Sequence, residues 1–89
     1  MAASEFRNFL EIYKSERYRA LMRELARKRS SWAELKRVLE AREGVMITHS
    51  EITKLLSNLI DASFVTKGED GTYFLPDPIV VEAASKGLI

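Results

Sequence analysis

Few side chains in this sequence of 89 residues could take part in catalysis. Acid–base or nucleophilic chemistry needs a nucleophile, a base and an orienting group in one pocket, and the sequence has one histidine and no cysteine. His49 falls in the first turn of a predicted helix, where a solvent-facing surface residue is the simpler interpretation. Glu69 and Asp70 lack the further oxygen ligands that calcium requires. We therefore expect no enzyme activity, no metal site and no cofactor.

Basic side chains are concentrated between Lys14 and Arg29, where the net charge is +5. Within this window, Arg19, Arg23 and Arg27 are spaced four residues apart and share one face of a predicted helix. Such a face could follow the phosphates of a nucleic acid by charge alone. The alternative is a solvated outer face, because charged faces are normal on surface helices. The two interpretations stay open, and Lys36, Arg37 and Arg42 on the next helix would extend the patch.

Composition predicts one small domain, because 89 residues provide only one core. The absence of cysteine excludes a disulfide framework and a thiolate metal site. No apolar run approaches the roughly 18 residues of a membrane span, and residues 1–5 lack the features of a signal peptide, so we expect a cytoplasmic protein. The net charge of +1 gives no overall electrostatic argument for a nucleic-acid partner.

Two abutting helices, rather than one bent helix, are predicted for residues 4–28. Ser4 is a candidate cap for the first helix and Ser15 for the second. The first helix carries an aromatic stripe of Phe6, Phe9 and Tyr13. If buried, the stripe closes the back of the domain, which is the favoured interpretation; if exposed, it is a face for a partner or a second copy.

A helix, a turn and a second helix follow between residues 31 and 61. Ser31 and Glu34 form a capping box, Gly44 ends the first of these helices, and Thr48 and Glu51 form a second capping box. The apolar positions expected to face the core are Trp32, Leu35, Val38 and Leu39 in the first helix, and Ile52, Leu55, Leu56, Leu59 and Ile60 in the second.

The second of these helices is the expected recognition helix. Its opposite face carries side chains that are polar and mostly short, which suits a groove of nucleic acid. Together with the following hairpin it has more acidic than basic residues, however, which weakens the usual mode of docking on a duplex. The side chains on this face are Thr53, Lys54, Ser57, Asn58 and Asp61.

A hairpin and a last helix complete the predicted order. Residues 64–67 and 72–75 are rich in β-branched and aromatic types and flank a four-residue loop with glycine at both ends. Asp77 and Pro78 then begin a helix, in which Ile79, Val80, Ala83 and Ala84 are expected to dock.

The predicted fold class is α+β and mainly α: a winged helix-turn-helix with a two-stranded wing and additional N-terminal and C-terminal helices. We expect a single domain over residues 1–89. It consists of a helical extension at 4–14, the winged helix-turn-helix core at 15–76 and a closing helix at 77–87.

Five segments share their pattern with one protein family. They are Tyr18–Ala26, Trp32–Leu35, Ser50–Ile60, Val65–Lys67 and Tyr73–Pro78. Their arrangement resembles the C-terminal winged-helix region of archaeal P-loop ATPases. In that family the last wing strand commonly runs through a tyrosine into an Asp-Pro pair that begins the closing helix.

The ATPase core of that family is absent from this sequence. None of the four glycines forms the G-x-x-x-x-G-K-[ST] loop that holds nucleotide phosphates. The resemblance therefore implies an excised domain or a stand-alone relative whose catalytic half lies elsewhere.

The first functional hypothesis is a non-catalytic module that binds nucleic acid, in particular duplex DNA. The recognition helix would contact the groove, and basic residues from three elements would hold phosphates. The groove-reading residues would be Thr53, Lys54, Ser57 and Asn58, and the phosphate-binding residues Arg19, Arg23, Arg27, Lys36 and Lys67.

The second hypothesis is a regulatory or docking winged helix. It would pack on an ATPase domain or on a second copy of itself, as a homodimer, through its first helix and its wing. Phe6, Phe9 and Tyr13 would then form the docking face.

Overall fold

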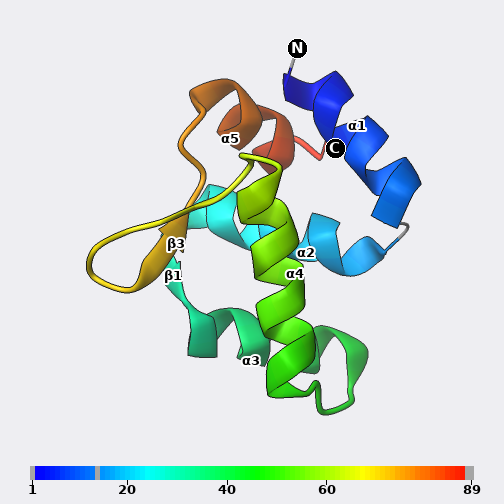
Figure 1. Cartoon of the computed structure of the whole chain (residues 1–89), viewed down its shortest axis with the longest axis vertical. Helices are drawn as coiled ribbons and strands as arrows, with labels where there is room; N and C mark the ends of the chain where they lie inside the picture. Colours follow the sequence, from blue (N-terminus) through cyan, green and yellow to red (C-terminus); the bar gives the residue numbers. More distant parts are fainter. Residues whose placement is uncertain (1, 14, 88–89) are drawn as a thin grey trace.

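The computed structural model describes residues 2–13 and 15–87, and for residues 2–5, 12 and 13 it describes the backbone only. The fold is an α+β winged helix, with five helices among the described residues and a small antiparallel sheet at one edge of the molecule (Figure 1). The elements in chain order are α1 (Ala2–Tyr13), α2 (Glu16–Arg27), β1 (Ser30–Ser31), α3 (Trp32–Glu43), α4 (His49–Asp61), β2 (Thr66–Lys67), β3 (Thr72–Phe74) and α5 (Pro78–Ser85).

The first two helices are separate, as predicted. Ser15 caps α2, and its hydroxyl accepts a hydrogen bond from the Arg17 amide at 3.3 Å. The prediction that Ser4 caps α1 is wrong, because α1 already begins at Ala2. Alanine is the best helix former and extends the helix beyond the serine.

The sheet has three strands, so the predicted two-stranded wing is incomplete. β1 pairs with β3 in the register Ser30 to Tyr73, and β3 also pairs with β2 in the order β1-β3-β2. A pair of serines has no β-propensity signal, so this strand could be found only from its backbone pairing.

The wing strands are also shorter than predicted. Phe64 and Val65, which were assigned to the first strand, precede β2 and are buried in the core. The chain reaches them through Ser63, whose φ of 69° lies in the left-handed region. Burial of these two apolar side chains takes the place of strand pairing.

The caps of α3, α4 and α5 hold as predicted, with one exception. The Ser31–Glu34 box is complete, with its two hydrogen bonds at 3.2 and 2.9 Å. Thr48 accepts from the Glu51 amide at 3.2 Å, but the Glu51 carboxylate binds Arg17 rather than closing a second box. Asp77 accepts from the Ile79 amide and so caps α5.

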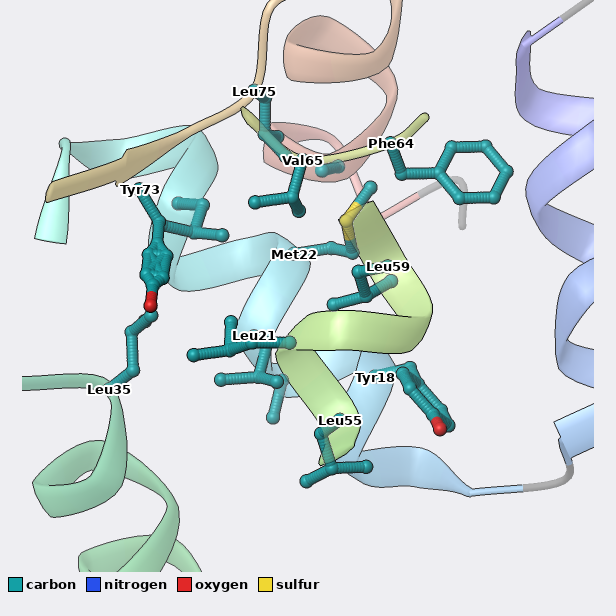
Figure 2. Close-up of a cluster of buried hydrophobic side chains, with 14 of the residues drawn as sticks. Tyr18, Leu21, Met22, Leu35, Leu55, Leu59, Phe64, Val65, Tyr73 and Leu75 are labelled. Carbon is teal, nitrogen blue, oxygen red and sulfur yellow. The ribbon is translucent and has the colours of Figure 1, made fainter. Parts of the chain in front are cut away.

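The core lies where α2 meets α4, α5 and the wing strands. Figure 2 shows Leu21 and Met22 of α2 beside Leu59 of α4, with Val65 and Leu75 close by. All five side chains are buried. No helix among the described residues is long and apolar enough to cross a membrane.

Two apolar residues expected in the core are exposed, and Trp32 and Val38 of α3 are only partly buried. Ile60 in α4 is 37% exposed, and Ile79 in α5 is 52% exposed. Both lie beside residues that are buried, because the buried face of each helix is narrower than its run of apolar residues. The buried residues of α5 are Val80, Ala83 and Ala84, as predicted.

Candidate nucleic-acid interface

The exposed face of α4 carries polar and mostly short side chains. The helix itself lies in front of α2 in Figure 1. Thr53, Lys54 and Ser57 are exposed, and Lys54 has no ion-pair partner among the described residues. Asn58 is only half-exposed, because its amide nitrogen donates to the Tyr18 hydroxyl at 2.9 Å. Of the four predicted groove-reading residues, three are therefore open to a ligand and one also joins α4 to α2.

A shallow groove separates α4 from the start of α2. Its rim combines charged side chains from both helices, and its floor includes the apolar Leu55. Lys54 and Asn58 lie in this groove, so the structure brings these two predicted residues together. The lining residues are Ser15, Arg17, Tyr18, Glu51, Lys54, Leu55 and Asn58.

Arg17 connects three helices at one end of this groove. Its guanidinium donates two hydrogen bonds of 2.8 Å to the Glu43 carboxylate of α3, and a third of 2.8 Å to Glu51 of α4. The hydrogen bonds that Arg17 donates to Glu43 and then to Glu51 raise the pKa of Arg17 above its ordinary value, and the pKa of Glu43 is lowered in turn. Arg17 is therefore committed to positioning α4.

The other three arginines of α2, which were predicted to bind phosphates, line different hollows from the one beside α4. Arg19 borders a hollow with Leu10 of α1, whereas Arg23 and Arg27 border another with Ser85 and Gly87 at the end of α5. The structure thus brings Arg23 and Arg27 together but does not place them on the exposed face of α4.

Most of the positive charge in the basic window is neutralised within the chain. Arg19 pairs with Glu16 at 3.1 Å, and Arg27 pairs with Glu24 at 3.3 Å. Arg23 is exposed and has no ion-pair partner among residues 2–13 and 15–87.

Lys28 and Glu34 join the end of α2 to the start of α3 in another ion pair, of 2.6 Å. This bond and the Ser31 amide lower the pKa of Glu34 to about 2. Lys28 is therefore also neutralised within the chain.

Lys36 is also held internally. Its ammonium group donates to Glu40 at 2.8 Å, and the same carboxylate oxygen accepts from the Ile47 amide at 2.9 Å. Both interactions lower the pKa of Glu40, that with Lys36 more strongly. Lys36 thus helps to hold the turn before α4, and its side chain is only 25% exposed.

The wing contributes one predicted residue and one that sequence reasoning left out. Lys67 is exposed, with its ammonium group 5.8 Å from the centre of the Tyr73 ring. Arg29, counted only as part of the basic window, lies with its guanidinium 4.3 Å above the Phe74 ring. Only the unpredicted strand β1, directly after Arg29, could have indicated that this residue reaches the wing.

The aromatic stripe of α1 is part of the core where it is described. Phe6 is fully buried and Phe9 is 6% exposed, and both rings contact Phe64 edge to face, at 5.1 and 5.5 Å. This agrees with the core interpretation and not with an exposed docking face. The side chain of Tyr13 lies outside the described residues.

Trp32 and His49 contact each other at the starts of α3 and α4, with ring centres 4.4 Å apart. His49 is exposed, whereas Trp32 packs at the edge of the core, and its indole nitrogen is buried without a hydrogen-bond partner among the described residues. The described residues contain no group of three or more histidine, cysteine, aspartate or glutamate residues that could hold a metal.

A comparison with protein families gives one match. Residues 13–75 match the model of the MCM protein C-terminal winged helix-turn-helix domain, which covers more than half of the chain. This confirms the predicted winged helix and its resemblance to a C-terminal domain, whereas an archaeal source stays a prediction. No curated protein matches the chain. With α2, β1, α3, α4 and the wing in the order that a winged helix requires, the chain belongs to the MCM C-terminal winged helix-turn-helix family.

Proposed function

We propose that this domain is a non-catalytic module that binds duplex DNA through α4 and the wing. The observation that carries the proposal is the exposed face of α4. It offers the hydroxyls of Thr53 and Ser57 and the ammonium group of Lys54, with no large side chain between them. A face of this kind enters a major groove without steric obstruction and can donate to base edges and phosphates.

The charge of this surface limits the strength of the proposed binding. Lys54 on α4 and Lys67 on the wing are the basic residues that these two elements offer, and Glu69 and Asp70 oppose them at the wing tip. Each phosphate neutralised adds about 0.9 to the salt slope, so two contacts give a slope of about −2. We therefore expect weak duplex binding with a shallow salt dependence.

The test is fluorescence anisotropy of a labelled random-sequence duplex at two or more salt concentrations. Lys54→Ala should weaken binding and reduce the salt slope by about one. Arg23→Ala is the matched control, because Arg23 is exposed and unpaired among the described residues but lies beside α5 rather than on the exposed face of α4.

The two variants separate the possible surfaces. Loss of binding in Arg23→Ala with no change in Lys54→Ala would move the interface to the Arg19, Arg23 and Arg27 face. No duplex binding by the wild type, even at low salt, would contradict the proposal as a whole.

A second candidate function is docking on an ATPase domain or on a second copy of the chain. The observation that favours it is the turn between α3 and α4, where Val45 is 55% exposed and Met46 is 88% exposed. Large apolar side chains held in the open are typical of interaction sites. The family match to a domain of MCM proteins supports an ATPase-type partner.

Sedimentation velocity tests the self-association form of this second function. A concentration-dependent increase in sedimentation coefficient that Met46→Ser abolishes would support docking through the turn. A single monomeric species up to millimolar concentration would exclude a homodimer and leave the ATPase domain as the partner to test.

A further inference from the structure

Arg29 lies next to the wing although it is far from the wing in the sequence. It precedes β1, and β1 pairs with β3, so the backbone places Arg29 beside the hairpin. Its guanidinium lies 4.3 Å above the Phe74 ring, and its Nε donates to the Thr72 hydroxyl at 3.2 Å. Two of its contacts are thus uncharged, and they fix the plane of the guanidinium without neutralising it.

Among the described residues the charge of Arg29 has one partner, Asp70, and the pair is loose. The distance from Arg29 Nη2 to Asp70 Oδ1 is 3.6 Å, whereas the ion pairs of Arg17, Arg19, Arg27 and Lys28 measure 2.6–3.3 Å. Asp70 Oδ1 instead has two closer donors, the Thr72 hydroxyl at 2.7 Å and the Thr72 amide at 3.0 Å. Both charged side chains are more than half exposed.

The wing leaves room for this guanidinium. A Cβ at Gly68 would lie 2.5 Å from Arg29 Nη2, closer than real Cβ atoms approach their neighbours, and at a tight 3.0 Å from Asp70 Oδ1. Gly68 does not have a positive φ, so its backbone conformation does not require glycine. A side chain at position 68 would therefore have to displace the end of the Arg29 side chain from the wing.

These observations describe an arginine that is oriented, exposed and only partly neutralised beside the loop of the wing. An oriented guanidinium with open N–H groups is the side chain best suited to a phosphate. We propose that Arg29 is a phosphate-binding residue of the wing, and that Asp70 competes with the phosphate for it. The inference deepens the proposed function and rests on it, because the phosphate would belong to the bound duplex.

The competition can be measured by removing the charge of Asp70. Asp70→Asn keeps the side-chain oxygen that accepts from Thr72, so the turn of the wing is preserved, but the carboxylate no longer opposes a phosphate at Arg29. We expect duplex binding to tighten about threefold in low salt, the size expected for one exposed ion pair. Glu69→Gln is the matched control: it removes the same charge from the neighbouring, exposed position.

A double-mutant cycle separates competition at Arg29 from the general effect of charge. In an Arg29→Ala background, Asp70→Asn should tighten binding no more than Glu69→Gln does. Arg29→Ala alone should reduce the salt slope by about one. Equal effects of Asp70→Asn and Glu69→Gln in the wild-type background would overturn the inference.

A second measurement keeps the inference testable if no duplex binds. The Arg29 Nε–H resonance can be followed by NMR while pyrophosphate is titrated into the wild type and into Asp70→Asn. A shift that saturates at lower pyrophosphate concentration in Asp70→Asn supports the phosphate site even if the proposed duplex function fails. No shift in either protein would overturn the phosphate site at Arg29. The duplex-binding assay of Lys54→Ala is a separate test, because it measures only the contribution of α4 to the proposed function.

Discussion

The turn between α3 and α4 and the wing both connect neighbouring elements of the fold, but different interactions hold them in place. In the turn, Ile47 is 2% exposed, its amide donates to Glu40, and Arg17 links the two flanking helices through three bonds of 2.8 Å. In the wing, one half-exposed arginine lies on one ring, with its carboxylate partner 3.6 Å away. The difference indicates that the fold fixes the orientation of α4 firmly and leaves the charges of the wing available.

The largest loss of stability should follow from removing the buried side chain of the turn before α4. Ile47→Ala removes a buried side chain, and we expect the free energy of unfolding to fall by about 2–4 kcal/mol. Urea unfolding followed by circular dichroism measures the change. Met46→Ala, at the 88% exposed neighbour, is the control and should change stability by less than about 0.5 kcal/mol. Equal losses in both variants would mean that Ile47 does not anchor the turn.

The next prediction compares the stability that Arg17 and Arg29 each contribute. Arg17→Ala should cost about 1–2 kcal/mol, because it removes three charge-assisted hydrogen bonds and leaves Glu43 and Glu51 near each other without a cation. Arg29→Ala should cost less than about 1 kcal/mol, since its ion pair is long and exposed. The same urea titration gives both values. A larger cost for Arg29→Ala would reverse the comparison between turn and wing.

The sequence was sufficient to predict the turn because its signals are local. Ser31 and Glu34 stand at capping-box spacing, and Gly44 lies where the helix ends, with a φ of 69°. Each of these features is decided by neighbours within four residues, so a single sequence contains the information. The same holds for Ser15 and Asp77 as caps.

The wing could be predicted only in part, because its missing features are contacts between distant residues. β1 is two serines that pair with residues more than 40 positions later, and Arg29 meets Thr72 across 43 positions. Helical spacing placed Arg19, Arg23 and Arg27 on one face, but it carried no information on which side of the fold that face lies. Glu16 and Glu24, three residues before Arg19 and Arg27, are local partners that the same spacing could have indicated.

Substitution of two glycines of the wing should cause the next smaller loss of stability. The two positions distinguish backbone strain from a steric clash of the added methyl group. Gly71 has a φ of 83° and open space around it, so Gly71→Ala should cost about 1 kcal/mol through strain alone. Gly68→Ala should cost less than about 0.5 kcal/mol, because the group that a methyl would meet first is the movable end of Arg29. Its effect should appear at Arg29 instead, as a changed Nε–H resonance in the NMR spectrum. An unchanged resonance would contradict the contact.

The smallest difference between the turn and the wing should appear in how their stability depends on pH. The pKa of Glu43 is lowered by its bonds from Arg17, and that of Asp70 is lowered mainly by its bonds from Thr72. A carboxyl group whose pKa is lower in the folded state stabilises the protein above its ordinary pKa, and this contribution is lost as the pH falls through the folded value. Stability should therefore decrease as the pH falls below about 4.5, the ordinary region for glutamate.

The two amide variants assign this loss to one region or the other. Glu43→Gln should be less stable than the wild type at pH 7, because it weakens the bonds to Arg17, and the gap should narrow between pH 7 and pH 3 as the Glu43 carboxylate of the wild type takes up a proton. Asp70→Asn should remain close to the wild type at pH 7, because the amide oxygen still accepts from Thr72. Urea titrations at the two pH values measure both gaps. A pH-7 deficit in Asp70→Asn as large as that in Glu43→Gln would mean that the Arg29 pair fixes the wing as firmly as Arg17 fixes α4, and that the wing charge is not available to a ligand.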